Sequence, residues 1–360
     1  MASRACLALS LAATLFIVTE APASAAPAPI EVRVVIVTTW EEEQKGRDKA
    51  GELHAWLIRW PLPTALPFPA GVRSLAYDPK TQVLAVLTGM ATAKAAASIM
   101  ALGLDPRFDL SHAYWIVAGT AGVDPKVASA GSAAWARFVV DGDLAQELDA
   151  RDMPPDWPIG IVPYDRSRPY EAPPPPMHSP SANVAYALNP HLADWAFNHT
   201  KDIALPDDTT LAQLRAPYSA EAARPPFVLE GDGLMSARTW YGERLNTWAR
   251  AWVSYWTGGA GLFAMSAEED TGIMQALTLL ANDGRARLDR VLILRAASDY
   301  TVGPPGVTAA QFLARETRDG FPAEAEALSS LYAVASPIAR FLTDDWVHTR
   351  DVTPGEGLAK

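Results

Sequence analysis

The carboxylate of Asp299 is the first candidate for chemistry in this chain. Residues 291–294 form a short aliphatic run, typical of a strand buried on both faces of a parallel sheet, and Ser298-Asp299 follows shortly after it. In open α/β folds, ligands bind outside the carboxyl ends of the strands. A carboxylate delivered there is placed to meet a ligand, although Asp299 could equally cap the next turn.

Two further groups of acids follow strand-like runs. The glutamates 41–43 come after a run rich in β-branched residues, and the acids 268–270 come after another apolar run. Each group also has a simpler structural explanation. The first could begin a solvated helix, where carboxylates favour the helix dipole, and Glu269 could complete a capping box with Ser266. The presence of acids at three strand ends nevertheless favours a ligand site.

Strand-like and helix-like segments alternate along the chain. This pattern predicts an α/β fold, a single three-layer domain with one central mixed β-sheet flanked by helices. Residues 119–122, Gly-Thr-Ala-Gly, follow a strand-like run and are expected to form a turn whose N–H groups could approach a ligand. Proline-rich residues 153–180 are expected to form an ordered extended loop or surface arm. Strands are expected at 31–37, 56–60, 72–77, 82–89, 113–118, 132–140, 227–230, 261–265 and from 291, and helices at 91–102, 182–197, 209–223, 271–281, 308–318 and 323–342.

The first 25 residues have the pattern of a secretory signal peptide. Arg4 precedes an apolar run, and residues 23–25 are small, as at a cleavage site. No later stretch has about 18 uninterrupted apolar residues. We therefore expect a secreted or periplasmic protein whose single domain spans 26–360, with the proline-rich insertion at 153–180.

The net charge and the motifs of the sequence limit the kinds of partner and cofactor to expect. The net charge of −11 argues against a nucleic-acid partner, which would require a basic face. The sequence shows no zinc-type Cys/His spacing and no P-loop, so we expect neither a metal nor another cofactor.

Five separated pieces of sequence resemble the nucleoside phosphorylase and nucleosidase superfamily. The strand-like run 31–37 together with 40–43 resembles the opening of the methylthioadenosine nucleosidases. Residues 119–122 resemble a glycine-containing loop of that fold, and 231–235 resemble its Gly-Asp segment beside the base. Residues 268–273 resemble a Met-Glu-Ala-x-Gly helix start and 295–299 an Arg-x-x-Ser-Asp element. Together with Gly-Val-Asp-Pro-Lys at 122–126, these pieces look most like the purine nucleoside permease group. The resemblance covers nearly all of residues 31–342.

The resemblance implies cleavage of an N-glycosidic bond through an oxocarbenium-like transition state. Asp299 would give a proton to the purine, which requires a raised pKa. Glu269 would bind the ribose hydroxyls, and Glu43 would orient or deprotonate the attacking water. The base would lie against Leu234, Met235 and Trp240. Further binding positions implied by the same motifs are Glu268, Gly119, Thr120, Ala121, Gly122, Ser298 and Arg295.

The sequence leaves three activities open. Hydrolysis is favoured because an acid at Glu43 would repel a phosphate nucleophile. Phosphorolysis, with phosphate as a second substrate, is the first alternative. The second is a non-catalytic purine nucleoside binder that delivers its ligand to a membrane transporter.

Three tryptophans define one face of an expected helix. Trp248, Trp252 and Trp256 are spaced i, i+4 and i+8, a pattern that predicts core or a subunit contact and not a ligand box. Because enzymes of the resembled fold assemble as oligomers, we expect a homo-oligomer, with this face as a candidate contact surface.

Overall fold

The computed structural model describes residues 27–41, 51–164, 166–172 and 184–356. The predicted signal peptide, Glu43 and the part of the proline-rich insertion at 173–180 lie outside these residues.

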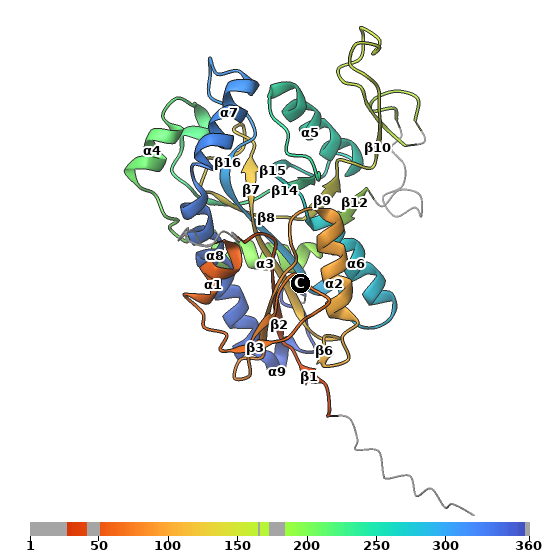
Figure 1. Ribbon diagram of the computed structural model, residues 1–360, viewed down its shortest axis with the longest axis vertical. Helices are drawn as coiled ribbons and strands as arrows, with labels where there is room; N and C mark the ends of the chain where they lie inside the picture. Colours follow the sequence, from red (N-terminus) through yellow and green to blue (C-terminus); the bar gives the residue numbers. More distant parts are fainter. Residues whose placement is uncertain (1–26, 42–50, 165, 173–183, 357–360) are drawn as a thin grey trace, which may run out of the picture.

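A central mixed β-sheet runs through the molecule (Figure 1). β7 (Tyr114–Val123) pairs in parallel with β2 (Val34–Thr38) and, from Trp115 to Val123, with β16 (Val291–Tyr300). β5 (Val83–Leu87) extends this parallel set beyond β2, whereas β15 (Phe263–Ala267) joins the far end of β7 in antiparallel orientation. The central strands are buried on both faces, which explains their nearly continuous apolar sequences.

Helices cover both faces of the sheet and create the three layers. α2 (Thr92–Gly103) and α6 (Asp270–Asn282) pack together on one face, in the same apolar cluster as Val35. α8 (Glu324–Asp344) lies on the other face, in the cluster that contains Val34. Adjacent residues of β2 thus serve opposite cores, as the two-residue period of a strand requires. The predicted α/β class with a flanked mixed sheet is confirmed.

Shorter elements complete the sheet edges and the outer layers. The remaining strands are β1 (Ile30–Glu31), β3 (Thr64–Leu66), β4 (Leu75–Asp78), β6 (Phe108–Asp109), β8 (Ala133–Trp135), β9 (Phe138–Asp141), β10 (Ala145–Glu147), β11 (Ile161–Pro163), β12 (Ala185–Ala187), β13 (Val228–Glu230) and β14 (Asp232–Met235). The remaining helices are α1 (Glu52–Leu57), α3 (Pro190–Thr200), α4 (Thr209–Arg215), α5 (Glu243–Trp256), α7 (Ala309–Asp319) and α9 (Trp346–Thr349).

The strand predicted at 56–60 is wrong. Trp56 lies in α1, and the backbone N–H of Trp60 donates to the Trp56 carbonyl at 2.8 Å. Both indoles are buried, with ring centroids 6.3 Å apart. A four-residue spacing brings side chains together on a helix, and so short an apolar run does not distinguish a helix from a strand.

The turn predicted at 119–122 is also wrong. These residues continue β7 to Val123, and β16 likewise continues through Asp299 to Tyr300. The two extended ends pair with each other, which supplies the backbone hydrogen bonds that neither segment could obtain alone.

Two predicted helices are shorter than expected. The segment 182–197 contains β12 and then α3, which begins only at Pro190. Asn189 caps the start of α3, because its side chain accepts a hydrogen bond from the His191 N–H. Within 209–223, α4 ends at Arg215, and a separate 3₁₀ turn covers Ala220–Ala223.

The three tryptophans of α5 belong to the core. Trp248, Trp252 and Trp256 are at most 3% exposed and pack with Phe263 and Leu234. Because their rings are buried within the chain, the suggestion that they form a subunit contact surface is wrong. None of the helices in the described part of the chain is long and apolar enough to span a membrane.

The described part of the proline-rich insertion is anchored to α5. β11 pairs with β10, and the Tyr255 hydroxyl donates to the Glu171 carbonyl at 2.7 Å.

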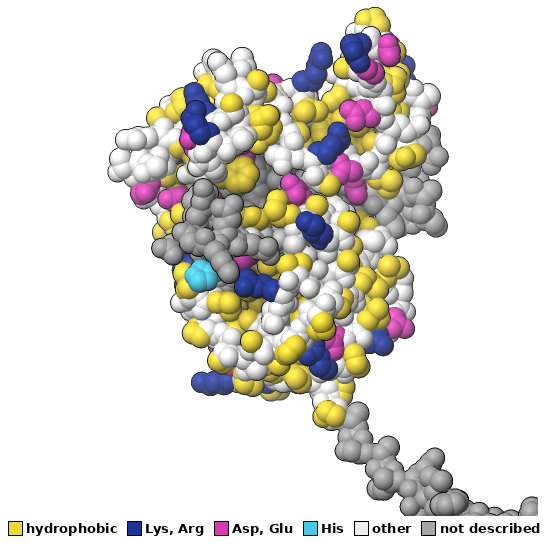
Figure 2. All heavy atoms as spheres, in the orientation of Figure 1, with side chains coloured by type: hydrophobic (Ala, Val, Ile, Leu, Met, Phe, Trp, Pro, Cys, Tyr) yellow, Lys and Arg dark blue, Asp and Glu magenta, His cyan; other side chains and the backbone are white. Residues whose placement is uncertain are grey.

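On the face drawn in Figure 2, acidic and basic side chains are interspersed, and the visible Lys and Arg residues form no continuous stripe.

Candidate functional site

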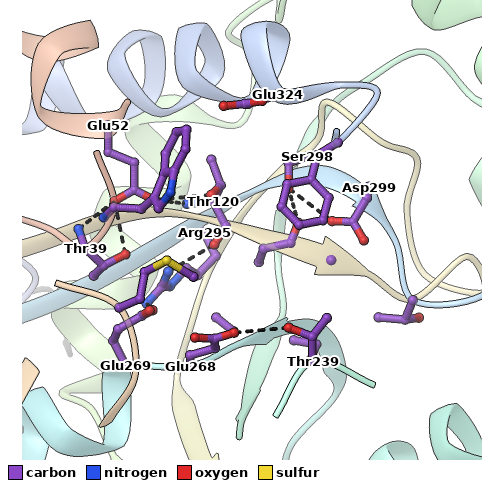
Figure 3. Close-up of a pocket in the computed structure, with 18 of the residues that line it drawn as sticks. Thr39, Glu52, Thr120, Thr239, Glu268, Glu269, Arg295, Ser298, Asp299 and Glu324 are labelled. Carbon is purple, nitrogen blue, oxygen red and sulfur yellow. Dashed lines mark hydrogen bonds and ion pairs between the residues drawn. The ribbon is translucent and has the colours of Figure 1, made fainter. Parts of the chain in front are cut away.

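A cavity lies at the carboxyl ends of β2, β7, β15 and β16 (Figure 3). The loop between β14 and α5 and the beginning of α8 complete its wall. It is the ligand position expected for an open α/β sheet. The lining residues are Thr39, Trp40, Glu52, Met90, Thr120, Ala121, Gly122, Thr239, Trp240, Tyr241, Ser266, Ala267, Glu268, Glu269, Arg295, Ser298, Asp299, Thr301, Phe321 and Glu324.

A β-bulge brings both Ser298 and Asp299 to the cavity. The pairing of β16 with β7 shifts between Ala297 and Asp299, so that Asp299 lies opposite Gly122. Successive side chains of a regular strand point to opposite faces, whereas the extra residue of a bulge changes the direction of a side chain. The bulge therefore explains how two adjacent side chains line one cavity.

The Asp299 carboxyl is buried beside a second acid. It is 7% exposed, and the Ser298 hydroxyl donates to its Oδ1 at 3.0 Å. Burial raises the pKa of Asp299 well above its usual range, and the neighbouring Glu316 carboxyl raises it further. Asp299 is thus suited to hold a proton, the property that the resemblance requires of it.

Arg295 ties two acids together under the cavity. Its Nη2 donates to Glu269 at 2.8 Å and also to Asp270, while its Nε donates to Asp270 at 3.1 Å. Burial opposes the charge on Arg295, but Asp270 and Glu269 raise its pKa. A Cβ at Gly119 would lie 2.4 Å from the Arg295 Nη1, so the glycine makes room for the guanidinium.

The predicted capping box at Ser266 and Glu269 is absent. Glu269 is the N-cap residue of α6 and makes no side-chain cap bond. Its carboxylate instead bridges Arg295 and the Ala91 N–H, at 2.8 and 3.2 Å. The tertiary ion pair has displaced the local cap.

Glu268 lines the cavity from the turn between β15 and α6. Its carboxylate accepts from the Thr239 hydroxyl at 3.2 Å, and burial, together with the Glu269 charge, raises the pKa of Glu268. Adjacent acids therefore differ in role: Glu269 is bound to Arg295, whereas Glu268 has only a hydroxyl partner among the described residues.

Glu52 is a site residue that sequence reasoning missed. It is 1% exposed, and its Oε2 accepts from the Thr39 and Trp40 N–H groups at 2.6 and 3.1 Å, while its Oε1 accepts from the Thr120 N–H at 2.7 Å. Burial raises the pKa of Glu52, against the attraction of Arg295. Glu52 joins the ends of β2 and β7, on the opposite side of the cavity from Asp299 in Figure 3.

The acids that immediately follow the first strand behave differently. Glu41 accepts from the N–H groups of Gly51 and His54 at 2.9 and 3.0 Å, so it satisfies the first turn of α1. Glu41 itself begins no helix; it accepts from the start of α1, which lies about ten residues further along the chain. Glu43 lies outside the described residues. The signal for Glu52 was weak, because it lies eleven residues beyond Glu41, before the strand expected at 56–60 and in none of the acidic groups that follow strand-like runs.

The remaining binding predictions divide into two groups. Thr120, Ala121, Gly122 and Trp240 line the cavity. Leu234 and Met235, predicted to contact the base, do not: both are at most 1% exposed in the apolar core. They lie within β14 and not in the loop that follows it, where Thr239, Trp240 and Tyr241 form that part of the wall.

The fold is that of the methylthioadenosine nucleosidases within the nucleoside phosphorylase-like class. A 5′-methylthioadenosine/S-adenosyl homocysteine nucleosidase from Helicobacter pylori superimposes with a TM-score of 0.51 at 12% identity, covering 88% of this chain and 99% of that one. A mutant of the Helicobacter pylori enzyme, with 5′-methylthioadenosine in its active site, also gives 0.51, at 11% identity over 87% and 99% of the two chains.

Sequence comparison identifies the family. The family described as purine nucleoside permease (NUP) matches residues 31–352. A probable purine nucleoside permease of Schizosaccharomyces pombe is 32% identical over 265 residues, which cover 72% of this chain and 75% of the relative. The purine nucleoside permease of Candida albicans is 29% identical over 268 residues, 72% of this chain and 64% of the relative. The chain belongs to the purine nucleoside permease family, which confirms the resemblance.

Proposed function

We propose that this protein binds a purine nucleoside in the cavity and hydrolyses its N-glycosidic bond. The observation that carries the proposal is the buried Asp299 carboxyl, which the bulge directs into the cavity and whose pKa is raised. The family name and the nucleosidase fold support the ligand class.

In the proposed mechanism one acid acts on the leaving base and two act on the sugar. Asp299 donates a proton to the purine, so that the base leaves without accumulating negative charge. Glu268 and Glu269 accept hydrogen bonds from ribose hydroxyls and stabilise the positive charge that develops on the sugar. Trp240, from the loop before α5, lies against the base.

In this proposal Glu52 takes the water-orienting role that the resemblance implied for Glu43. It is a buried carboxylate in the cavity wall, near Arg295, and across the cavity from Asp299. One face of the sugar would then meet the water, while the base leaves toward Asp299. Cleavage breaks the C1′–N9 bond, forms a C1′–OH bond from water, and transfers one proton to the base.

The charge of the cavity favours water over phosphate. Among the described lining residues, Arg295 is the one cation, and it is already bound to two carboxylates. Glu52, Glu268 and Asp299 add further acid groups to the same wall. A phosphate dianion would be repelled by any of these groups that is ionised, so phosphorolysis is the less favoured alternative.

Base release from a panel of purine nucleosides, with and without phosphate, tests the proposal. Hydrolysis predicts equal release under both conditions. Release that requires phosphate would convert the assignment to phosphorolysis. Tight binding with the nucleoside recovered intact would instead support a binding component that delivers its ligand to a membrane transporter, the role suggested by the family name.

We further propose that the chain is exported and acts outside the cytoplasm as a homo-oligomer. The signal-like pattern of residues 1–25 supports export. N-terminal sequencing of the mature protein would test cleavage near residue 25, and sedimentation would test the oligomer.

A further inference from the structure

Glu316 is a buried acid that the proposed mechanism does not use. It lies in α7, whose other buried side chain is Phe312, one turn earlier on the same face. Glu316 is 8% exposed, and neither of its carboxyl oxygens has a well-formed hydrogen-bond partner among the described residues. Burying an ionised carboxylate in this way is costly unless the charge is neutralised or shared.

The groups that face Glu316 are acids and phenols. The Tyr241 ring packs edge-on against Phe312, one turn before Glu316, with ring centroids 5.9 Å apart. The Tyr241 hydroxyl and the Asp299 carboxyl are the neighbours that act on the Glu316 carboxyl, and Asp299 and Glu316 both raise the pKa of Tyr218. The charge of Arg315, the residue before Glu316 on α7, lowers the pKa of Tyr218. Among the described residues, no Lys or Arg forms an ion pair with Glu316. A proton is therefore the available means of neutralising the pair.

We propose that Glu316 is a positioning residue that shares a proton with Asp299 and keeps Asp299 in its acid form until a substrate base accepts that proton. The proposal rests on the proposed nucleosidase function. Asp299 lines the cavity and Glu316 does not, so the shared proton leaves the pair through Asp299. Two interacting buried carboxyls titrate as one unit, because both cannot ionise without strong repulsion.

The proton balance is complete without another reactant. The pair loses one proton to the departing base, and the attacking water releases one proton as the C1′–OH bond forms. That second proton, carried by the cavity acids or solvent, restores the pair after the products leave. While Asp299 is ionised, a protonated Glu316 donates to it and limits the cost of the buried charge.

The pair predicts a definite pH effect. Burial, opposed by the neighbouring Tyr241 hydroxyl and Asp299 carboxyl, raises the pKa of Glu316 to about 7. The Glu316 charge that appears above this pH in turn raises the pKa of Asp299. Turnover requires protonated Asp299, so Glu316 extends activity toward higher pH.

The test compares Glu316→Gln with the wild-type chain. We expect the high-pH limb of the kcat profile to move to lower pH by about one unit, with kcat at pH 8 falling roughly 10-fold and KM changing little. Glu316→Asp should restore part of the shift because it keeps a carboxyl. Asp319→Asn, which alters an exposed acid on the same helix, should leave the profile unchanged. An unchanged profile in Glu316→Gln with normal melting would overturn the proposal.

A second measurement separates this proposal from the proposed function. Carboxyl ¹³C NMR of aspartate-labelled, ligand-free protein follows the Asp299 titration directly, with Asp299→Asn used to assign the signal. Glu316→Gln should lower the titration midpoint even if the wild-type protein releases no base. An unchanged midpoint would contradict the shared proton, whereas a lowered midpoint without base release would contradict only the nucleosidase function.

Discussion

Asp299 lies opposite Gly122 in the pairing of β16 with β7, one position earlier than an unbroken register would place it. A Cβ at Gly122 would come within 3.2 Å of the Asp299 Oδ2 and 3.4 Å of its Oδ1. The bulge directs the carboxyl into the cavity, and the glycine leaves it the space to remain there.

Gly122→Ala should therefore displace the Asp299 carboxyl. We expect base release to fall about 10-fold, because a small misplacement of a catalytic group costs rate, while the unfolding free energy changes by about 1 kcal/mol or less. Steady-state kinetics and thermal melting check the two effects. Full activity in a normally folded variant would show that Asp299 does not need this position.

Asp299→Asn should separate binding from turnover. The amide keeps the shape of the side chain but cannot donate an acidic proton, so we expect turnover to fall about 10²- to 10⁴-fold while nucleoside affinity stays within a few-fold. Calorimetry and single-turnover assays measure the two quantities. Asp283→Asn, an exposed acid beyond α6, is the matched control. Unchanged turnover in Asp299→Asn would remove this residue from the mechanism.

Glu52→Gln should weaken both the fold and the activity. Both Glu52 oxygens accept backbone N–H groups, and an amide NH₂ cannot replace either acceptor. We expect a loss of about 1–3 kcal/mol in unfolding free energy, measured by urea titration, together with slower base release. Glu147→Gln, at an exposed acid, is the control. Wild-type stability in Glu52→Gln would mean that the two strand ends are held together without this carboxylate.

The sequence predicted the layered fold and the Asp299 side of the cavity better than the Glu52 side. Continuous apolar strands were sufficient to indicate the α/β class, and two of the acids at their ends, Asp299 and Glu269, do line the cavity. The bulge at Ser298 was not predictable, because it depends on the pairing of β16 with β7. Glu52 was not predictable either, since its three N–H donors come from strand ends distant in sequence. Glu316 lies in a polar helix whose acids read as solvated.

The Glu316 carboxyl should make stability depend on pH. Its folded pKa, about 7, exceeds its value in an unfolded chain, about 4.3. The folded state therefore binds more protons, and the contribution of Glu316 to stability falls as pH rises through this window. The Glu316→Gln variant has no carboxyl to ionise at this position, so it does not lose this stability as pH rises. The difference in unfolding free energy between the variant and the wild type should therefore shift in favour of the variant between pH 4.5 and 7.5, by about 1 kcal/mol after solvent screening. Urea unfolding at several pH values tests this, and a pH-independent difference would contradict it.

Isotope tracing from water tests the central claim most directly. The protein would be incubated with a purine nucleoside and phosphate in H₂¹⁸O, and the sugar product would be analysed promptly by mass spectrometry, with enzyme-free ribose correcting for exchange at C1′. Hydrolysis at the cavity predicts ¹⁸O at C1′ above that background, no sugar phosphate, and loss of the product in Asp299→Asn. Recovery of ribose 1-phosphate, or of intact nucleoside alone, would contradict the account.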